Sequence, residues 1–212
     1  MNERNLILKV LKLDRDIHNN LLQSSNAFQL LIPLFFIYQF VSYFVGKVLS
    51  LNYLKYLKTF IATNSEYLGA SPDEINSLSN EIDYLIQIIN TPLQIADIFP
   101  SVFIGLILLS IYLGSIFLGL KIKQIKTNFK DLIVLYLASL IPKIFYLIVL
   151  FVDKPVFQGL IVFVFFIYSL VVRFSAFKQI YFLNNFEAFT TLIIWPFVIF
   201  FTTSYLLNLL IL

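Results

Sequence analysis

Lys143 is the side chain whose setting in this sequence points most directly to chemistry. It follows Pro142 near the middle of 131–153, a stretch that is otherwise apolar, or small and weakly polar, between Asp131 and Asp153. About 20 apolar residues are enough to cross a bilayer as a helix. A cation at the centre of such a helix costs about 2.5–3.5 kcal/mol on insertion scales, so an ionisable residue at that depth is a functional candidate.

Two interpretations of Lys143 are open. In the functional one, the ammonium lines an ion or substrate pathway, or it pairs with an acid on another chain. In the purely structural one, the long side chain reaches the membrane interface, or it donates to the carbonyl of Ser139. The carbonyl that Pro142 itself leaves without a partner is that of Ala138, because proline lacks a backbone N–H.

Other groupings that could support catalysis are absent from the sequence. It has no cysteine, and His18 is its single histidine, so one chain cannot assemble a thiolate or a His-rich metal site. Asp131 and Asp153 stand at the ends of their apolar stretch, which does not suit an intramembrane aspartyl protease. The six glycines are scattered and form no phosphate-binding loop. We therefore expect a protein that is not an enzyme and needs no cofactor.

The composition is that of an integral membrane protein. Apolar residues make up 59% of the chain and charged residues 13%, whereas soluble domains carry roughly 25% charged residues. The sequence pI of about 9.0 does not indicate nucleic-acid binding, because the basic residues cluster beside apolar segments, where they set membrane topology. The expected partners are the lipid bilayer and other integral membrane proteins or further copies of the chain, with no nucleic acid.

The pattern predicts an all-α polytopic bundle that follows a short amphipathic segment, 1–26. In that segment the residues that approximate one apolar helical face are Ile7, Val10, Leu11, Ile17 and Leu21. It suits either a basic helix on an anionic leaflet or a charged flank packed under the bundle. The membrane domain is 27–212, with an extracytoplasmic helical insertion at 50–97 and predicted spans at 27–45, 98–120, 132–152, 156–172 and 188–212.

The insertion carries a helix-start signal at Ser71-Pro72-Asp73-Glu74. Serine is a good N-cap, proline suits the first helical position, and glutamate at the third position completes a capping box. We expect a helix over 72–89, with Gly69 ending the helix before it. Its apolar seam, with 3-4-3-4 spacing, consists of Ile75, Leu78, Ile82, Leu85 and Ile89. The seam either docks a partner, or packs as a hairpin on the preceding helix or on the membrane surface.

Small residues recur four apart in the second predicted span. Ser110 pairs with Gly114, and Ser115 pairs with Gly119. Such small-xxx-small pairs permit close approach of two helices in a membrane, so these four residues are candidate packing positions. In the fifth span, Pro196 follows Trp195 and predicts a kink.

The charges predict an orientation. With the N-terminus, the 121–130 loop and the 173–187 connector on one side, that side holds Arg4, Lys9, Lys12, Arg15, Lys121, Lys123, Lys126, Lys130, Arg173 and Lys178. The other side holds Lys47, Lys55, Lys58 and Lys154. Positive charge marks the cytoplasmic side, so the N-terminus is predicted to be cytoplasmic and the C-terminus extracytoplasmic.

Residues of the last three spans resemble the Yip1 domain family. The run Leu135-Tyr136-Leu137-Ala138-Ser139-Leu140-Ile141-Pro142 is similar to that family's tyrosine-small-residue-proline run in its third span. Tyr168-Ser169-Leu170 through Phe182-Leu183-Asn184-Asn185-Phe186-Glu187-Ala188 resembles the end of the fourth span and its connector. The resemblance covers roughly 98–200. It implies a five-span membrane protein that associates with other membrane proteins, here of the bacterial inner membrane.

Two functions are therefore expected as alternatives. One is a non-enzymatic, Yip1-like scaffold or accessory subunit of a membrane complex. The other is a small transporter or channel component that uses Lys143. The first predicts co-purification with membrane proteins without flux, and the second predicts flux that depends on Lys143.

Overall fold

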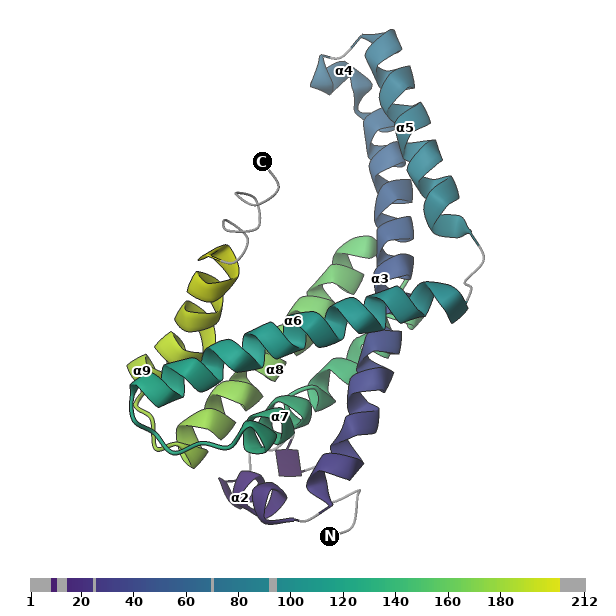
Figure 1. Ribbon diagram of the computed structural model, residues 1–212. Coiled ribbons are helices and arrows are strands. Elements are labelled where there is room, and N and C mark those ends of the chain that lie inside the picture. Colours follow the sequence, from purple (N-terminus) through teal and green to yellow (C-terminus); the bar gives the residue numbers. More distant parts are fainter. Residues whose placement is uncertain (1–8, 11–14, 25, 70, 92–94, 203–212) are drawn as a thin grey trace.

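The computed structural model describes residues 9–10, 15–24, 26–69, 71–91 and 95–202, which form helices and turns with no strand among them (Figure 1). The elements are α2 (Arg15–Gln23), α3 (Ala27–Thr63), α4 (Ser65–Leu68), α5 (Pro72–Asn90), α6 (Ile95–Ile122), α7 (Phe129–Ala138), the 3₁₀ helix η1 (Ile141–Phe151), α8 (Pro155–Ile180), α9 (Asn185–Phe189) and the π-helical turn η2 (Thr190–Ile194). An α-helix continues from η2 through residue 202. The predicted all-α class is confirmed.

Five segments of the described chain are long and apolar enough to cross a membrane. They are Ala27–Thr63, Ile98–Ile122, Phe129–Phe151, Pro155–Ile180 and Asn185–Thr202. Each overlaps one predicted span, so the multi-pass prediction is confirmed, while 203–212 of the predicted fifth span lie outside the described residues. The third segment is the central one, because 67% of its most apolar window is buried, against 17–28% in the other four.

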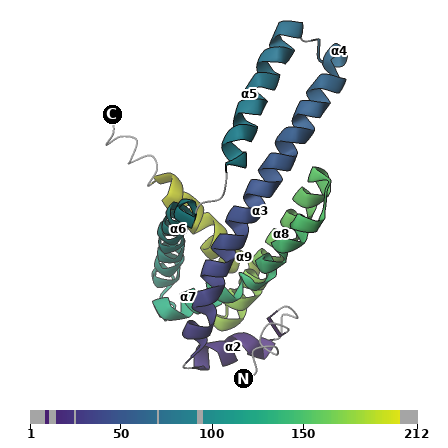
Figure 2. The ribbon, with the colours of Figure 1, turned by 90° about the vertical axis from the view of Figure 1, so that its right-hand side faces the viewer.

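Helix α3, which contains the first span, is much longer than the predicted span 27–45. Its second half extends beyond the bundle. The Asn52 side chain donates to Gln158 Oε1 at 3.3 Å, so the start of α8 lies level with Asn52. Past that level, α3 and α5 lie side by side and project from the rest of the molecule (Figures 1 and 2). Lys58 of α3 and Asp83 of α5 form an ion pair at 2.6 Å between them.

The start of α5 follows from its local sequence. Ser71 Oγ accepts from the backbone N–H of Glu74 at 3.3 Å, and the Ser71 backbone N–H donates to Glu74 Oε2 at 2.8 Å. The predicted capping box is therefore confirmed, and the helix runs one residue beyond the predicted end at 89. Gly69 ends the preceding turn with φ of +62°, a left-handed conformation that favours glycine.

The predicted seam of α5 is not uniformly buried. Ile82 is buried and Ile75 and Ile89 are partly buried, but Leu78 and Leu85 are 44% and 45% exposed. A helix has 3.6 residues per turn and drifts away from a strict 3.5-residue repeat, so the two leucines lie at the edge of the contact with α3.

The third span breaks at Pro142, in the middle of the apolar stretch. Helix α7 ends at Ala138, and the chain continues from Ile141 as the 3₁₀ helix η1. Proline cannot donate to the carbonyl four residues earlier and its ring clashes there, which ends α7 at Ala138. A 3₁₀ helix of 11 residues is unusually long, since such runs seldom exceed three or four residues.

The described part of the N-terminal segment packs under the bundle. Ile17, His18 and Leu21 of α2 are buried, and α2 contacts α7 and α8. Ile7 and Leu11 of the predicted face lie outside the described residues. The packing fits the second of the two interpretations of this segment, and a membrane-surface role stays a prediction.

The four small residues of α6 do not act alike. A Cβ added at Gly119 would lie 3.0 Å from Trp195 Cδ1, so α6 and the last helix approach closely there. A Cβ at Gly114 would meet nothing within 4 Å. Ser110 and Ser115 bond carbonyls of their own helix, those of Leu106 and Tyr112.

Candidate functional site

All five spans line one cavity of about 670 Å³. Its walls are mostly apolar, and its polar lining consists of Tyr38 and Gln39 of α3, Tyr112 of α6, Tyr136 of α7, Lys143 of η1 and Arg173 of α8. The size is in the range of small-molecule sites, which are typically apolar with a few convergent polar groups.

Lys143 is one of two buried cations in this cavity. Its side chain is only 7% exposed, its Nζ donates to Tyr38 Oη at 3.3 Å, and it lies 4.9 Å and 5.3 Å from the ring centroids of Tyr38 and Phe166. The Ser139 carbonyl, which sequence analysis considered as its acceptor, instead accepts from Ser169 Oγ at 2.6 Å. Lys143 is thus held by aromatic side chains at the cavity wall.

Arg173 is the second cation, and sequence analysis missed it. It was placed in a connector after a span ending at 172, whereas α8 continues to Ile180 and buries Arg173 to 7% exposure. Its Nε donates to Ser139 Oγ at 3.2 Å. Its guanidinium lies 4.5 Å from the centroid of the Tyr136 ring. Ser169 and Arg173, four residues apart on α8, share a helical face, and that spacing was the available signal.

Tyr112 links Arg173 to the last span. Its hydroxyl accepts from Arg173 Nη1 at 3.0 Å and donates to the Leu192 carbonyl at 3.3 Å. Pro196 cannot donate to that carbonyl four residues before it, so the tyrosine supplies the missing hydrogen bond. The π-helical turn η2 ends at Ile194, two residues before Pro196, where sequence analysis predicted a kink. The proline therefore helps to place Tyr112 against Arg173.

The cavity carries positive charge without a counter-charge from its own walls. None of the described lining residues is acidic, and Arg173 acts electrostatically on Lys143. Cation–π contacts offset about 0.5–2 kcal/mol each, and hydrogen bonds to a charged group about 1.5–3 kcal/mol. These contacts hold the two cations in place, and no described lining residue adds a negative charge. Such a cavity is suited to an anion.

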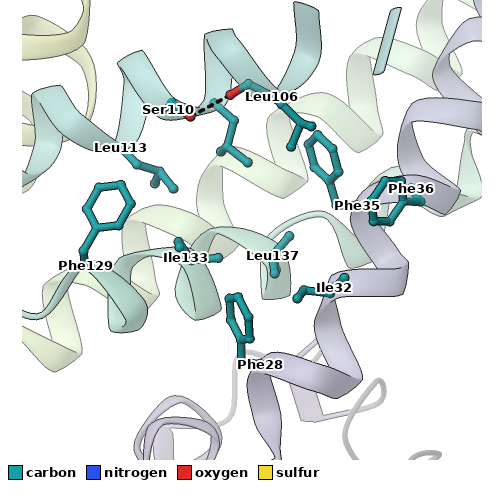
Figure 3. Close-up of a pocket in the computed structure, with 11 residues that line it drawn as sticks. Phe28, Ile32, Phe35, Phe36, Leu106, Ser110, Leu113, Phe129, Ile133 and Leu137 are labelled. Atoms are coloured by element: carbon teal, nitrogen blue, oxygen red, sulfur yellow. Dashed lines mark hydrogen bonds between the residues drawn. The ribbon is translucent and has the colours of Figure 1, made fainter. Parts of the chain in front are cut away.

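A separate apolar pocket lies between α3, α6 and α7 (Figure 3). It has a volume of about 260 Å³, and its lining is apolar apart from Ser110, whose hydroxyl donates to the Leu106 carbonyl at 2.8 Å. Phe28 and Ile133 point into it from below in the view of Figure 3. Because none of its lining residues is charged, this pocket has no group that could bind an ion or act as an acid or base.

The structure brings Lys143 to the cavity, whereas Pro142 lies outside the cavity lining and acts through the break that it causes between α7 and η1. Gly119 packs against Trp195 outside the cavity lining, and the α5 seam lies on the projecting helices, away from the cavity. No group of three or more metal-binding side chains occurs among the described residues. The chain matches no protein-family model, no curated protein and no solved structure.

Proposed function

We propose that this protein binds an anion inside the membrane, between Lys143 and Arg173, and works as a small transporter or channel component. The observation that carries the proposal is the pair of buried cations lining one cavity without an acid among its described residues. A bound anion would supply the missing counter-charge, and a buried charge with a partner costs far less than one without.

Each cation has a distinct part in the proposed site. Arg173 is fixed by Ser139, Tyr112 and Tyr136, so its planar guanidinium is oriented before the anion arrives. Lys143 has one long hydrogen bond, to Tyr38, and supplies a point charge that can reorient. The Tyr38 hydroxyl accepts from Lys143 and keeps its own hydrogen to donate to the anion.

Irregular backbone beside the cavity supports a transport role. Tyr136 and Lys143 flank the break between α7 and η1, and Leu192 and Ile193 lie in the π-helical turn η2; all four line the cavity. Within a membrane, broken helices are tolerated where they are buried or line a cavity, and in transporters they surround the substrate site.

The scaffold or accessory-subunit role is a second candidate, favoured by the projecting helices. Tyr84, Leu85 and Ile88 of α5 are 65%, 45% and 50% exposed, an apolar surface outside the main bundle. Such surface is typical of protein contacts. Pull-down from mild detergent with mass spectrometry tests this role, because an accessory subunit should bring a stable membrane-protein partner with it.

The finer membrane arrangement is also proposed. The charge distribution supports a cytoplasmic N-terminus, an extracytoplasmic C-terminus and α5 as part of an external helical hairpin. Membership of the Yip1 family and residence in a bacterial inner membrane rest on the sequence resemblance alone.

Thermal stability tests the anion site. The purified protein in uncharged detergent is titrated with sodium phosphate against sodium chloride at constant ionic strength. Ligand that binds only the folded state raises Tm, so we expect phosphate to stabilise the wild type. Lys143→Met should abolish the response. Lys121→Met, which removes an exposed cation of α6, is the matched control and should keep it. An equal response in Lys143→Met would contradict the proposal.

A further inference from the structure

We propose that the anion is the phosphate head group of a membrane lipid, whose chain occupies an apolar pocket beside the cavity. The inference rests on the proposed anion site and adds the class of ligand. This second pocket is distinct from the pocket of Figure 3 and has a volume of about 230 Å³. The residues that it shares with the cavity are Tyr112, Leu170, Arg173, Leu192 and Ile193. The two spaces are therefore adjacent, and Arg173 lies in the wall of both.

The lining of the second pocket suits the acyl chain of a lipid. Beyond the shared residues, its walls are Ile167, Val171 and Phe174, and all three are apolar. Ile167 and Val171 are 41% and 44% exposed on α8, which places the mouth of the pocket on a bilayer-facing surface. A membrane lipid reaches this mouth by lateral diffusion, whereas a hydrophilic solute would have to leave water to do so.

Arg173 stands at the junction of the two spaces, where the head group of such a lipid would lie. A guanidinium binds phosphate through two parallel N–H bonds, and Lys143, which lines the same cavity, adds the second charge. Leu170, one helical turn before Arg173, lines both spaces and would contact the first carbons of the chain. Along α8, the apolar residues Ile167, Leu170 and Val171 precede Arg173, and Phe174 follows it. Apolar wall therefore adjoins the cation, which suits an anion that carries an acyl chain.

The mechanism that follows is lateral entry. The acyl chain of the lipid enters between α8 and the last span. The η2 turn of that span contributes Leu192 and Ile193 to both the pocket and the cavity. The phosphate then reaches Arg173 first and Lys143 second. The two cations would hold the head group at a depth where a phospholipid phosphate does not otherwise stay.

Native mass spectrometry from uncharged detergent tests this proposal with three probes. The probes are 1-oleoyl lysophosphatidate, 1-oleoylglycerol and glycerol 3-phosphate. The wild type should bind lysophosphatidate about tenfold or more tightly than either of the others, a ratio the peak intensities report directly. Val171→Phe, which fills the chain pocket, should lose this advantage. Val164→Phe, two turns earlier on the same exposed face of α8, is the matched control and should keep it.

The outcomes separate the two proposals. A phosphate response that needs Lys143, with lysophosphatidate binding no tighter than glycerol 3-phosphate, overturns the lipid inference and leaves the anion site. Lysophosphatidate binding that Val171→Phe does not weaken also overturns the inference. Equal binding of 1-oleoylglycerol and lysophosphatidate, unchanged in Lys143→Met, overturns the anion site itself.

Discussion

At the scale of single residues, the two buried cations are held in different ways. Arg173 has hydrogen bonds to Ser139 and Tyr112 and contacts two rings, so its charge is part of the packing. Lys143 has one hydrogen bond at 3.3 Å, to Tyr38. Removal of the Lys143 charge should therefore cost the fold little, whereas removal of Arg173 leaves buried polar groups without their donor.

The first prediction concerns Lys143→Met in phosphate-free buffer. The change removes a costly intramembrane charge, worth about 2.5–3.5 kcal/mol on insertion scales, and a repulsive neighbour of Arg173. We expect Tm to rise above that of the wild type, while Lys121→Met, which removes an exposed contact with the Phe117 ring, should not raise Tm. A clear fall in Tm would mean that Lys143 holds the bundle together, and would count against a site built for a ligand.

The sequence revealed Lys143 and not Arg173, for a physical reason. A cation in mid-span stands out against its own apolar neighbours, so one stretch of sequence is enough. Arg173 lies near the end of a span, where basic residues ordinarily flank the membrane. Its burial depends on Tyr112, Tyr136 and Ser139, which come from two other spans, and no local pattern encodes that arrangement.

At the scale of elements, local signals predicted what local forces determine. The cap of α5 is complete within Ser71 to Glu74, so the sequence was sufficient to place the helix start. The seam of α5 was different, because its burial depends on how α3 lies against it. The break after Ala138 follows from Pro142, but the long 3₁₀ run of η1 has no evident local cause.

The second prediction concerns the cap of α5. Ser71→Ala should loosen the first turn by about 1 kcal/mol, the usual effect of losing an N-cap side chain. Amide exchange across 73–78 should become faster than in the wild type, while exchange in the last turn of α5 stays the same. Equal protection of 73–78 in both proteins would show that the cap contributes nothing.

The cap also predicts a pH dependence. The Ser71 backbone N–H and hydroxyl donate to the Glu74 carboxylate and lower the pKa of Glu74 below its ordinary value. A group with a lowered folded-state pKa stabilises the fold above its unfolded pKa, and that contribution is lost as the pH falls through the folded pKa. Protection of 73–78, corrected for intrinsic exchange, should therefore fall in acid for the wild type and change less for Glu74→Gln.

The third prediction compares two glycines of α6. Gly119→Ala would press a methyl group against Trp195, at a cost of about 1–3 kcal/mol for overpacking, whereas Gly114→Ala meets open space. Both changes gain about 1 kcal/mol of helix propensity. Gly119→Ala should therefore melt below Gly114→Ala. If the two variants melt together, α6 and the last helix do not approach at Gly119.

At the scale of the whole molecule, the orientation in the membrane is predicted from charge alone. Burial removes Arg173 from the ten basic residues assigned to the cytoplasmic side and leaves nine, against four on the other side. The bias survives this correction. The number of spans could be predicted because length and hydropathy decide it, whereas the cavity could not, since it arises where five spans meet.

The fourth prediction tests that orientation. A reporter that is active only outside the cytoplasm should work when fused after Leu212 and fail when fused within the 121–130 loop. The opposite pattern would invert the bundle and place the projecting helices α3 and α5 in the cytoplasm. A second fusion within 64–70 should give the same result as the fusion after Leu212, because both positions are predicted to be extracytoplasmic.

The central claim is that Lys143 and Arg173 bind one anion together, and a double-mutant cycle tests it most directly. Calorimetry gives the phosphate affinity of the wild type, Lys143→Met, Arg173→Lys and the double variant, with Lys178→Gln as the exposed control on α8. Groups that share a ligand are coupled, with interaction energies of about 0.5–3 kcal/mol. The account predicts that the double variant loses clearly less affinity than the sum of the single losses. Strictly additive losses, or affinities equal to that of the wild type, would contradict it.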